Sequence, residues 1–175
     1  DLNKPYNLNY TTNEKISSKE KQDLLNRMWR NQCINDTYEP GSTFKVITST
    51  AALENNQVTM DTRFSCPGFR IVDDRRIRCH KTTGHGSENF LQGVMNSCNP
   101  VFIDVGLKVG KEKFYEQMRK LGLMNKTGID LPGEASTIIH KLKNVGNVEL
   151  ATMSFGQSFQ ITPMQYLVAA SAVIN

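Results

Sequence analysis

A serine and a lysine three residues apart, Ser42 and Lys45, stand directly after the helix-breaking segment Glu39-Pro40-Gly41. Ser42 suits the first turn of a helix, and residues at this spacing share one helix face, so the amine can reach the hydroxyl. A serine becomes nucleophilic when a neighbouring base removes its proton, and desolvation can lower the pKa of a lysine enough for that task. Such a pair is also common as a helix cap followed by a solvated lysine. The two residues alone leave both interpretations open.

A second group of reactive side chains, Cys66, Cys79, His80 and His85, lies in a segment punctuated by glycines. Thiolate and imidazole are ligands that zinc prefers, and four of them complete a tetrahedral site. The spacing is not that of a standard zinc finger, because Cys66 and Cys79 are far apart and Cys79 and His80 are adjacent. With four cysteines in the chain, one disulfide, a metal site and plain buried thiols all remain possible.

The composition indicates one ordinary globular domain. The chain has 175 residues, of which 38% are hydrophobic and 22% charged, and its net charge of +4 is spread along the sequence. Without a basic block, no nucleic-acid partner is expected. No stretch approaches the roughly 18 apolar residues of a membrane span. The ends at Asp1 and Asn175 suggest a fragment, so we expect any anchor or targeting segment outside it.

Periodicity and capping residues then predict the elements that position these side chains. Residues 61–86 alternate in polarity between glycines and a proline, which favours short strands in a hairpin-like excursion. Apolar residues at helical spacing, with cap and stop signals, predict helices elsewhere. These run from Glu20 to before Asn31, Ser42 to about Glu54, Ser87 to about Asn96, Pro100 to about Val109, Lys111 to Leu121, and from Thr162 onward.

Longer motifs around Ser42 favour a nucleophile and its base over a simple helix cap. The segment from Tyr38 to Lys45, Tyr-Glu-Pro-Gly-Ser-Thr-Phe-Lys, resembles the first active-site motif of the class B penicillin-binding proteins. Ser97-Cys98-Asn99 resembles their second motif, Ser-x-Asn. Further matches in the same order cover essentially the whole chain; they are Asp1 to Pro5, Gly84-His85-Gly86, Thr127 to Glu134, Ser154 to Gln157 and Ile161 to Gln165.

The resemblance implies the mixed α/β fold of the penicilloyl-serine transferases, which is shared by β-lactamases and transpeptidases. Residues 1–175 would form a single partial transpeptidase domain, mostly the helical lobe. The C-terminal strands with the third motif, Lys-Thr-Gly or Lys-Ser-Gly, are expected outside this chain. Lys126-Thr127-Gly128 has the right letters but lies in a loop before Ile129 to Glu134. We therefore expect the fragment alone to be inactive.

The resemblance also implies a function, namely a serine-type peptidoglycan D,D-transpeptidase that is acylated by β-lactams. Ser42 would attack a stem peptide and Lys45 would be its base. Ser97 would relay a proton, and Asn99 would hydrogen-bond the substrate backbone. Gly156 and Gln157 would line the cleft. Two alternatives remain: a β-lactam sensor or β-lactamase-type domain, and a non-catalytic scaffold that binds zinc or cell-wall peptide.

Sporulation-type and clostridial members of the family carry a cysteine pair around this excursion, and some bind zinc beside the active site. The resemblance thus implies zinc on Cys66, Cys79 and one or both of His80 and His85, with Asp73 or Asp74 in reserve. The rival is a disulfide between Cys66 and Cys79, while Cys98 is expected in the core. A membrane-anchored enzyme with an extracytoplasmic catalytic domain and a cell-wall glycosyltransferase as partner is also implied.

Overall fold

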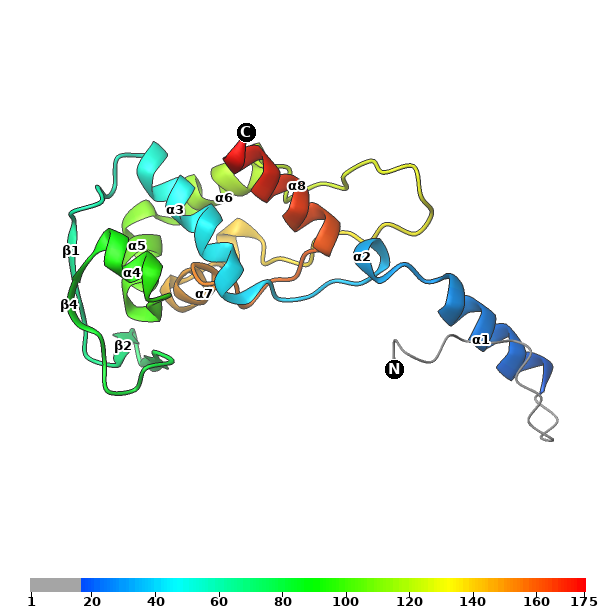
Figure 1. Ribbon diagram of the computed structural model, residues 1–175, viewed down its shortest axis with the longest axis horizontal. Helices are drawn as coiled ribbons and strands as arrows, with labels where there is room; N and C mark the ends of the chain where they lie inside the picture. The colour runs from blue at the N-terminus through cyan, green and yellow to red at the C-terminus, as the bar shows by residue number, and fades with distance from the viewer. Residues whose placement is uncertain (1–16) are drawn as a thin grey trace.

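The computed structural model describes residues 17–175, so the match at Asp1 to Pro5 lies outside the described part. Figure 1 shows a helical body with strands at one end. The helical elements are α1 (Ser18–Trp29), α2 (Gln32–Asn35), the 3-10 turn η1 (Gly41–Phe44), α3 (Lys45–Glu54), α4 (Phe90–Met95), α5 (Asn99–Val109), α6 (Lys111–Lys120), the 3-10 turn η2 (Leu142–Asn144), α7 (Asn147–Met153) and α8 (Pro163–Ile174). The strands are β1 (Arg63–Cys66), β2 (Phe69–Val72), β3 (Arg75–Arg78) and β4 (Gly86–Asn89).

The core forms around α5, which is buried along most of its length and contacts α3, α6 and α7. A helix that is apolar on nearly all sides has to lie inside the molecule, and α5 does so. Aromatic rings fill the space beside it; Phe90 and Phe102 have centroids 6.1 Å apart, and Phe44 meets Phe159 edge to face at 4.7 Å. Because α3 follows Ser42 and α5 follows Ser97, this packing fixes the distance between the two motifs.

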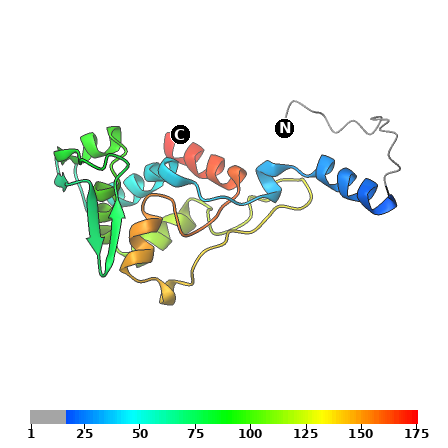
Figure 2. The ribbon, with the colours of Figure 1, turned by 90° about the horizontal axis from the view of Figure 1, so that it is seen from below.

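The predicted strand excursion is confirmed as two antiparallel pairs, β1 with β4 and β2 with β3. In β1 the alternation puts Phe64 and Cys66 inside and their neighbours outside. Figure 2 shows the strands beside the helices at the end of the body remote from α1. The excursion thus places Cys66 and the end of β3 next to the core rather than in solvent.

Capping boxes begin α1, α4 and α8, but one of the predicted helix starts is wrong. Thr162 and Gln165 form the expected capping box at α8. The predicted start of a helix at Ser87 is wrong, because Ser87 pairs with Ser65 in the β1–β4 ladder. Asn89 caps α4 instead, in a capping box with Gln92. The strand therefore takes Ser87, Glu88 and Asn89, which the sequence pattern assigns to the helix.

The helix at the N-terminal side, α1, projects from the body and buries none of its residues (Figure 1). It begins at a capping box between Ser17 and Glu20, close to the predicted start. Across residues 17–175, none of the helices has both the length and the apolar character needed to cross a membrane.

A contact between two glycine backbones sets the position of the turn that carries Ser42. The N–H of Gly41 donates to the carbonyl oxygen of Gly156 at 2.9 Å. A Cβ on Gly156 would lie only 2.1 Å from the carbonyl oxygen of Gly41, and Gly156 has a φ of +85°. Both the close approach and the left-handed backbone require glycine at position 156.

Replacing Gly156 with alanine is therefore expected to destabilise the protein more than replacing Gly122. Gly122 has a φ of +75° with nothing within 4 Å of an added Cβ, so its variant carries only backbone strain, about 1 kcal/mol. Gly156→Ala adds overpacking against Gly41, with a further loss of about 2 kcal/mol in the free energy of unfolding. Chemical unfolding of both variants measures the difference, and equal losses would contradict the argument.

Candidate active site

Ser42 lies in the η1 turn, and Lys45 begins α3 one turn later. The turn is held by the hydroxyl of Thr43, which donates to the carbonyl oxygen of Pro40 at 2.8 Å. Ser42 is exposed, whereas Lys45 is only 5% exposed. The Nζ of Lys45 lies 3.2 Å from the Oγ of Ser42, so the two side chains share one face as their spacing predicts.

The amine of Lys45 brings both motifs together. Besides Ser42, its Nζ contacts the carbonyl oxygen of Ser97 at 2.7 Å, the Oγ of Ser97 at 2.9 Å and the Oδ1 of Asn99 at 2.8 Å. The carbonyl and amide oxygens can only accept, so they take two N–H groups. In a neutral amine the remaining lone pair then faces the two hydroxyls, which is the arrangement that a base for either serine needs.

Burial lowers the pKa of Lys45 to about 8, while nearby Cys98 and Cys79 act in the opposite direction. A lysine in water has a pKa near 10.4 and carries almost no neutral amine at pH 7. The shift makes an appreciable fraction of Lys45 neutral close to physiological pH. The local environment therefore suits Lys45 to accept a proton.

The second motif is held in an unusual backbone conformation. Ser97 has a φ of +48°, and Cys98 after it is the N-cap residue of α5. The side-chain amide of Asn96 donates to Oε2 of the buried Glu88 at 2.9 Å. Asn99 donates through Nδ2 to the carbonyl oxygen of Arg78 at 3.2 Å, which leaves its Oδ1 for Lys45. Contacts on both sides thus orient the side chains of Ser97 and Asn99.

A cavity of about 490 Å³ opens beside Ser42. Gln157 lines it, as predicted, but Gly156 is not among its lining residues. Gly156 instead contacts the Gly41 backbone, and the substrate-binding role predicted for it stays a prediction. The lining residues come from both motifs, β3 and the segment after α7; they are Gly41, Ser42, Arg76, Ile77, Arg78, Asn99, Phe155 and Gln157.

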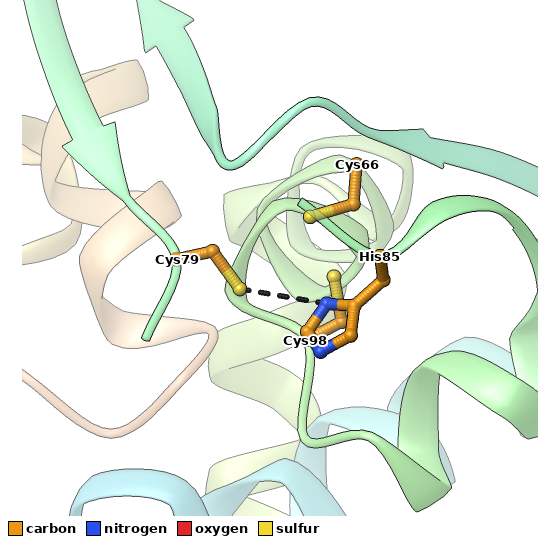
Figure 3. Close-up of side chains that lie close together, drawn as sticks. All are labelled: Cys66, Cys79, His85 and Cys98. Carbon is orange, nitrogen blue, oxygen red and sulfur yellow. Dashed lines mark hydrogen bonds between the residues drawn. The ribbon is translucent and has the colours of Figure 1, made fainter. Parts of the chain in front are cut away.

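Four of the reactive side chains form a compact cluster next to the second motif (Figure 3). The candidate ligand atoms of Cys66, Cys79, His85 and Cys98 all lie within 4.8 Å of one another, and the three cysteines are buried. The Sγ of Cys79 lies 3.7 Å from the Nδ1 of His85. All four cysteines of the chain are free thiols in this structure, so the alternative disulfide is not formed.

The membership of this cluster differs from the ligand set that the sequence predicts. His80 is exposed, with 3.8 Å between its Nδ1 and the Sγ of Cys79 and 5.2 Å between its ring centroid and that of His85. It lies outside the group of four. Cys98, which the sequence places in the core, takes the fourth position. Its place between Ser97 and Asn99 was the available signal, because it puts a thiol inside the second motif.

Glu88 is a further buried polar residue that sequence reasoning missed. Its Oε1 lies 4.0 Å from the Nδ1 of His85 and, among the described residues, has no hydrogen-bond partner. The cluster of Cys66, Cys79, His85 and Cys98 thus has a carboxylate beside it. Three thiols and an imidazole match the donor chemistry of a structural zinc site.

The tripeptide Lys126-Thr127-Gly128 lies far from this chemistry, in a loop folded over a carboxylate. The backbone N–H groups of Thr127 and Gly128 donate to Glu134 at 2.6 and 3.2 Å. No strand contains the tripeptide in the described part of the chain. It is a loop motif, as the sequence position indicated.

Comparison with known proteins places this geometry in a family. Residues 5–175 match the family model described as the penicillin binding protein transpeptidase domain. The chain is 47% identical to Stage V sporulation protein D of Bacillus subtilis over 147 residues, which is 83% of this chain and 23% of that protein. It is 29% identical to peptidoglycan D,D-transpeptidase MrdA of Acinetobacter baumannii, covering 88% of this chain and 25% of that protein.

Comparison with solved structures leads to the same family. A solved structure of a putative peptidoglycan glycosyltransferase from Atopobium parvulum superposes with a TM-score of 0.79 at 29% identity, over 86% of this chain and 36% of that one. This chain thus spans about a quarter of the length of the curated relatives named above. The predicted fold class is confirmed, and the chain belongs to the penicillin-binding protein transpeptidase family.

Proposed function

We propose that this chain carries the nucleophile and base of a peptidoglycan D,D-transpeptidase. The observation that carries the proposal is the amine of Lys45, which contacts Ser42, Ser97 and Asn99 at once. Relatives named as peptidoglycan D,D-transpeptidases and penicillin-binding proteins support it. Stem peptides and β-lactams are then the expected acylating compounds.

In the first half-reaction the neutral amine of Lys45 takes the proton of Ser42 while Oγ bonds to the penultimate carbonyl carbon of the donor peptide. The backbone N–H of Ser42 supplies half of the oxyanion hole. As the carbon–nitrogen bond breaks, the terminal D-alanine leaves as an amine and takes a proton through Ser97. Asn99 hydrogen-bonds the peptide backbone. The product is an acyl ester on Ser42 and a neutral leaving amine.

In the second half-reaction the amine of an acceptor strand attacks the ester. A new amide bond forms, the bond to Oγ of Ser42 breaks, and Oγ regains the proton that the amine releases. The other half of the oxyanion hole belongs, on this proposal, to the third motif outside residues 1–175. We therefore propose that the fragment alone is inactive and that assays need the complete domain.

The biological setting is also a proposal. The identity to a protein named for stage V of sporulation supports a role in spore formation. Peptidoglycan is cross-linked outside the cytoplasmic membrane, so we place the domain on that side, held by an anchor elsewhere in the protein. A cell-wall glycosyltransferase is the partner that would supply the strands to be joined.

The nucleophile can be tested with the complete domain and a penicillin. Intact-mass measurement is expected to give one stable adduct in the unmutated domain and none in Ser42→Ala, because removing the hydroxyl removes the bond-forming atom. Rapid turnover of the drug instead of a stable adduct would favour a β-lactamase. An absent adduct in the folded, unmutated domain would overturn the proposal and favour a non-catalytic scaffold.

The pH dependence tests the base. Only the neutral form of Lys45 accepts a proton, and this form increases as pH rises through the pKa of about 8. The acylation rate is therefore expected to rise nearly tenfold per pH unit below that value and to level off above it. Lys45→Arg, which stays charged throughout this range, should lose most of the rate. A rate that is flat with pH would exclude Lys45 as the base.

We also propose a structural zinc site formed by Cys66, Cys79, His85 and Cys98. Their ligand atoms lie within 4.8 Å of one another, and the donor set is one that zinc favours. When bound, zinc would cross-link β1, the end of β3 and the second motif. Burial and the contact with Glu88 raise the pKa of the Cys98 thiol, so the thiol stays protonated until a metal displaces its proton.

Metal analysis of purified variants tests this site. His85→Ala and Cys66→Ser are expected to lose zinc and to melt at a lower temperature. His80→Ala and Cys33→Ser should keep it, because His80 and Cys33 lie outside the cluster. If the unmutated protein contains no zinc and takes up none, the site is refuted. Loss of zinc in both His85→Ala and His80→Ala would instead support the ligand set expected from the sequence, Cys66, Cys79, His80 and His85.

A further inference from the structure

Strand β3 brings two arginines, Arg76 and Arg78, to the edge of the cavity that contains Ser42. Alternate residues of a strand share a face, so the two side chains lie on the same side of the β2–β3 hairpin. Their cross-strand partners are Ile71 and Phe69. Val72, which is buried, lies on the opposite face toward the core.

These two guanidinium groups lack the acidic partners that other arginines of the hairpin have. Arg70 forms an ion pair with Asp104 of α5, and Arg75 lies 3.6 Å from Asp74. Within residues 17–175, neither Arg76 nor Arg78 forms an ion pair. Two uncompensated positive charges thus border the cavity, whose remaining lining residues carry no charge.

The arginines stand on a strand that is fixed to the body. The guanidinium of Arg76 stacks on the ring of Phe69, with 3.8 Å between its central carbon and the ring centroid. The carbonyl oxygen of Arg78 accepts a hydrogen bond from Asn99 of the second motif. The Arg70–Asp104 pair ties β2 to α5. The fold therefore sets the position of strand β3 and its two arginines relative to Ser42. This reduces the entropy lost when an anion binds.

We infer that Arg76 and Arg78 form a subsite for a free carboxylate of the peptide that acylates Ser42. The guanidinium group offers paired N–H donors that match a carboxylate, and hydrogen bonds between charged groups are stronger than neutral ones. A stem peptide has a terminal carboxylate and, where it contains a dicarboxylic residue, a second one. This inference rests on the proposed transpeptidase function and adds substrate selectivity to it.

The test compares thioester analogues of the stem peptide that differ only in having a free carboxylate or its primary amide. One pair changes the side-chain carboxyl and a second pair changes the carboxyl on the leaving thiol. Acylation of the complete domain is followed by thiol release. We expect the unmutated domain to prefer the acid by at least about tenfold in one pair, which corresponds to about 1.4 kcal/mol. The pair that shows the preference identifies the carboxylate.

The double variant R76Q/R78Q should lose this preference, whereas R75Q should retain it. Arg75 is the matched control, because it is exposed on the same strand and does not line the cavity. A variant with lysine at both positions should keep part of the preference. Added salt should weaken it in the unmutated domain, because exposed charges are screened.

Two outcomes would overturn the subsite: equal rates for acid and amide in the unmutated domain, or an unchanged preference in R76Q/R78Q. Both are distinguishable from failure of the proposed function, because the penicillin adduct on Ser42 is measured first on the unmutated domain. A penicillin carries its own carboxylate, so the melting temperature, and not the adduct, shows that R76Q/R78Q is folded. If no preparation forms an adduct, the transpeptidase proposal fails instead.

Discussion

The buried amine of Lys45 is the interaction on which the candidate active site depends. Oxygen atoms of Ser42, Ser97 and Asn99 all lie within 3.2 Å of it, although Ser42 belongs to a different chain segment from the other two. A lysine loses hydration when it is buried, and these oxygens replace the water. The same burial lowers its pKa to about 8. One arrangement therefore both brings the two motifs together and favours the neutral amine of Lys45.

That arrangement needs Ser97 in a backbone conformation that most residues avoid. A positive φ on a residue with a Cβ costs about 1 kcal/mol, and the φ of Ser97 is +48°. Contacts on both sides offset the cost. Glu88 accepts from Asn96 before it, and Cys98 after it is fully buried. The carbonyl oxygen of Ser97 itself accepts from Lys45. Contacts with buried residues therefore stabilise the strained conformation of Ser97.

The parts of the site that depend on local rules follow from the sequence. Helical spacing predicts that Ser42 and Lys45 meet, and the Thr162–Gln165 capping box predicts the start of α8. The start of α4 does not follow, because Ser87 and Asn89 are both good caps and pairing with β1 decides between them. The cluster contains Cys98 in place of the predicted His80, and contacts between distant segments decide this too. In the sequence His80 lies in the same short segment as the other candidate ligands, but three-dimensional packing turns it to solvent.

The cluster and the cavity are coupled through the chain itself. Cys79 directly follows Arg78, and Cys98 separates Ser97 from Asn99, so two members of the cluster are covalently joined to residues that line the cavity or contact Lys45. The hydrogen bond from Asn99 to the carbonyl oxygen of Arg78 also connects the second motif directly to the end of β3. Moving Cys79 relative to Cys98 would therefore move the β3 edge of the cavity relative to the second motif. Because catalysis depends on ångström-scale positioning of reacting groups, packing within this small cluster bears directly on the positions of Ser97 and Asn99 around the amine of Lys45.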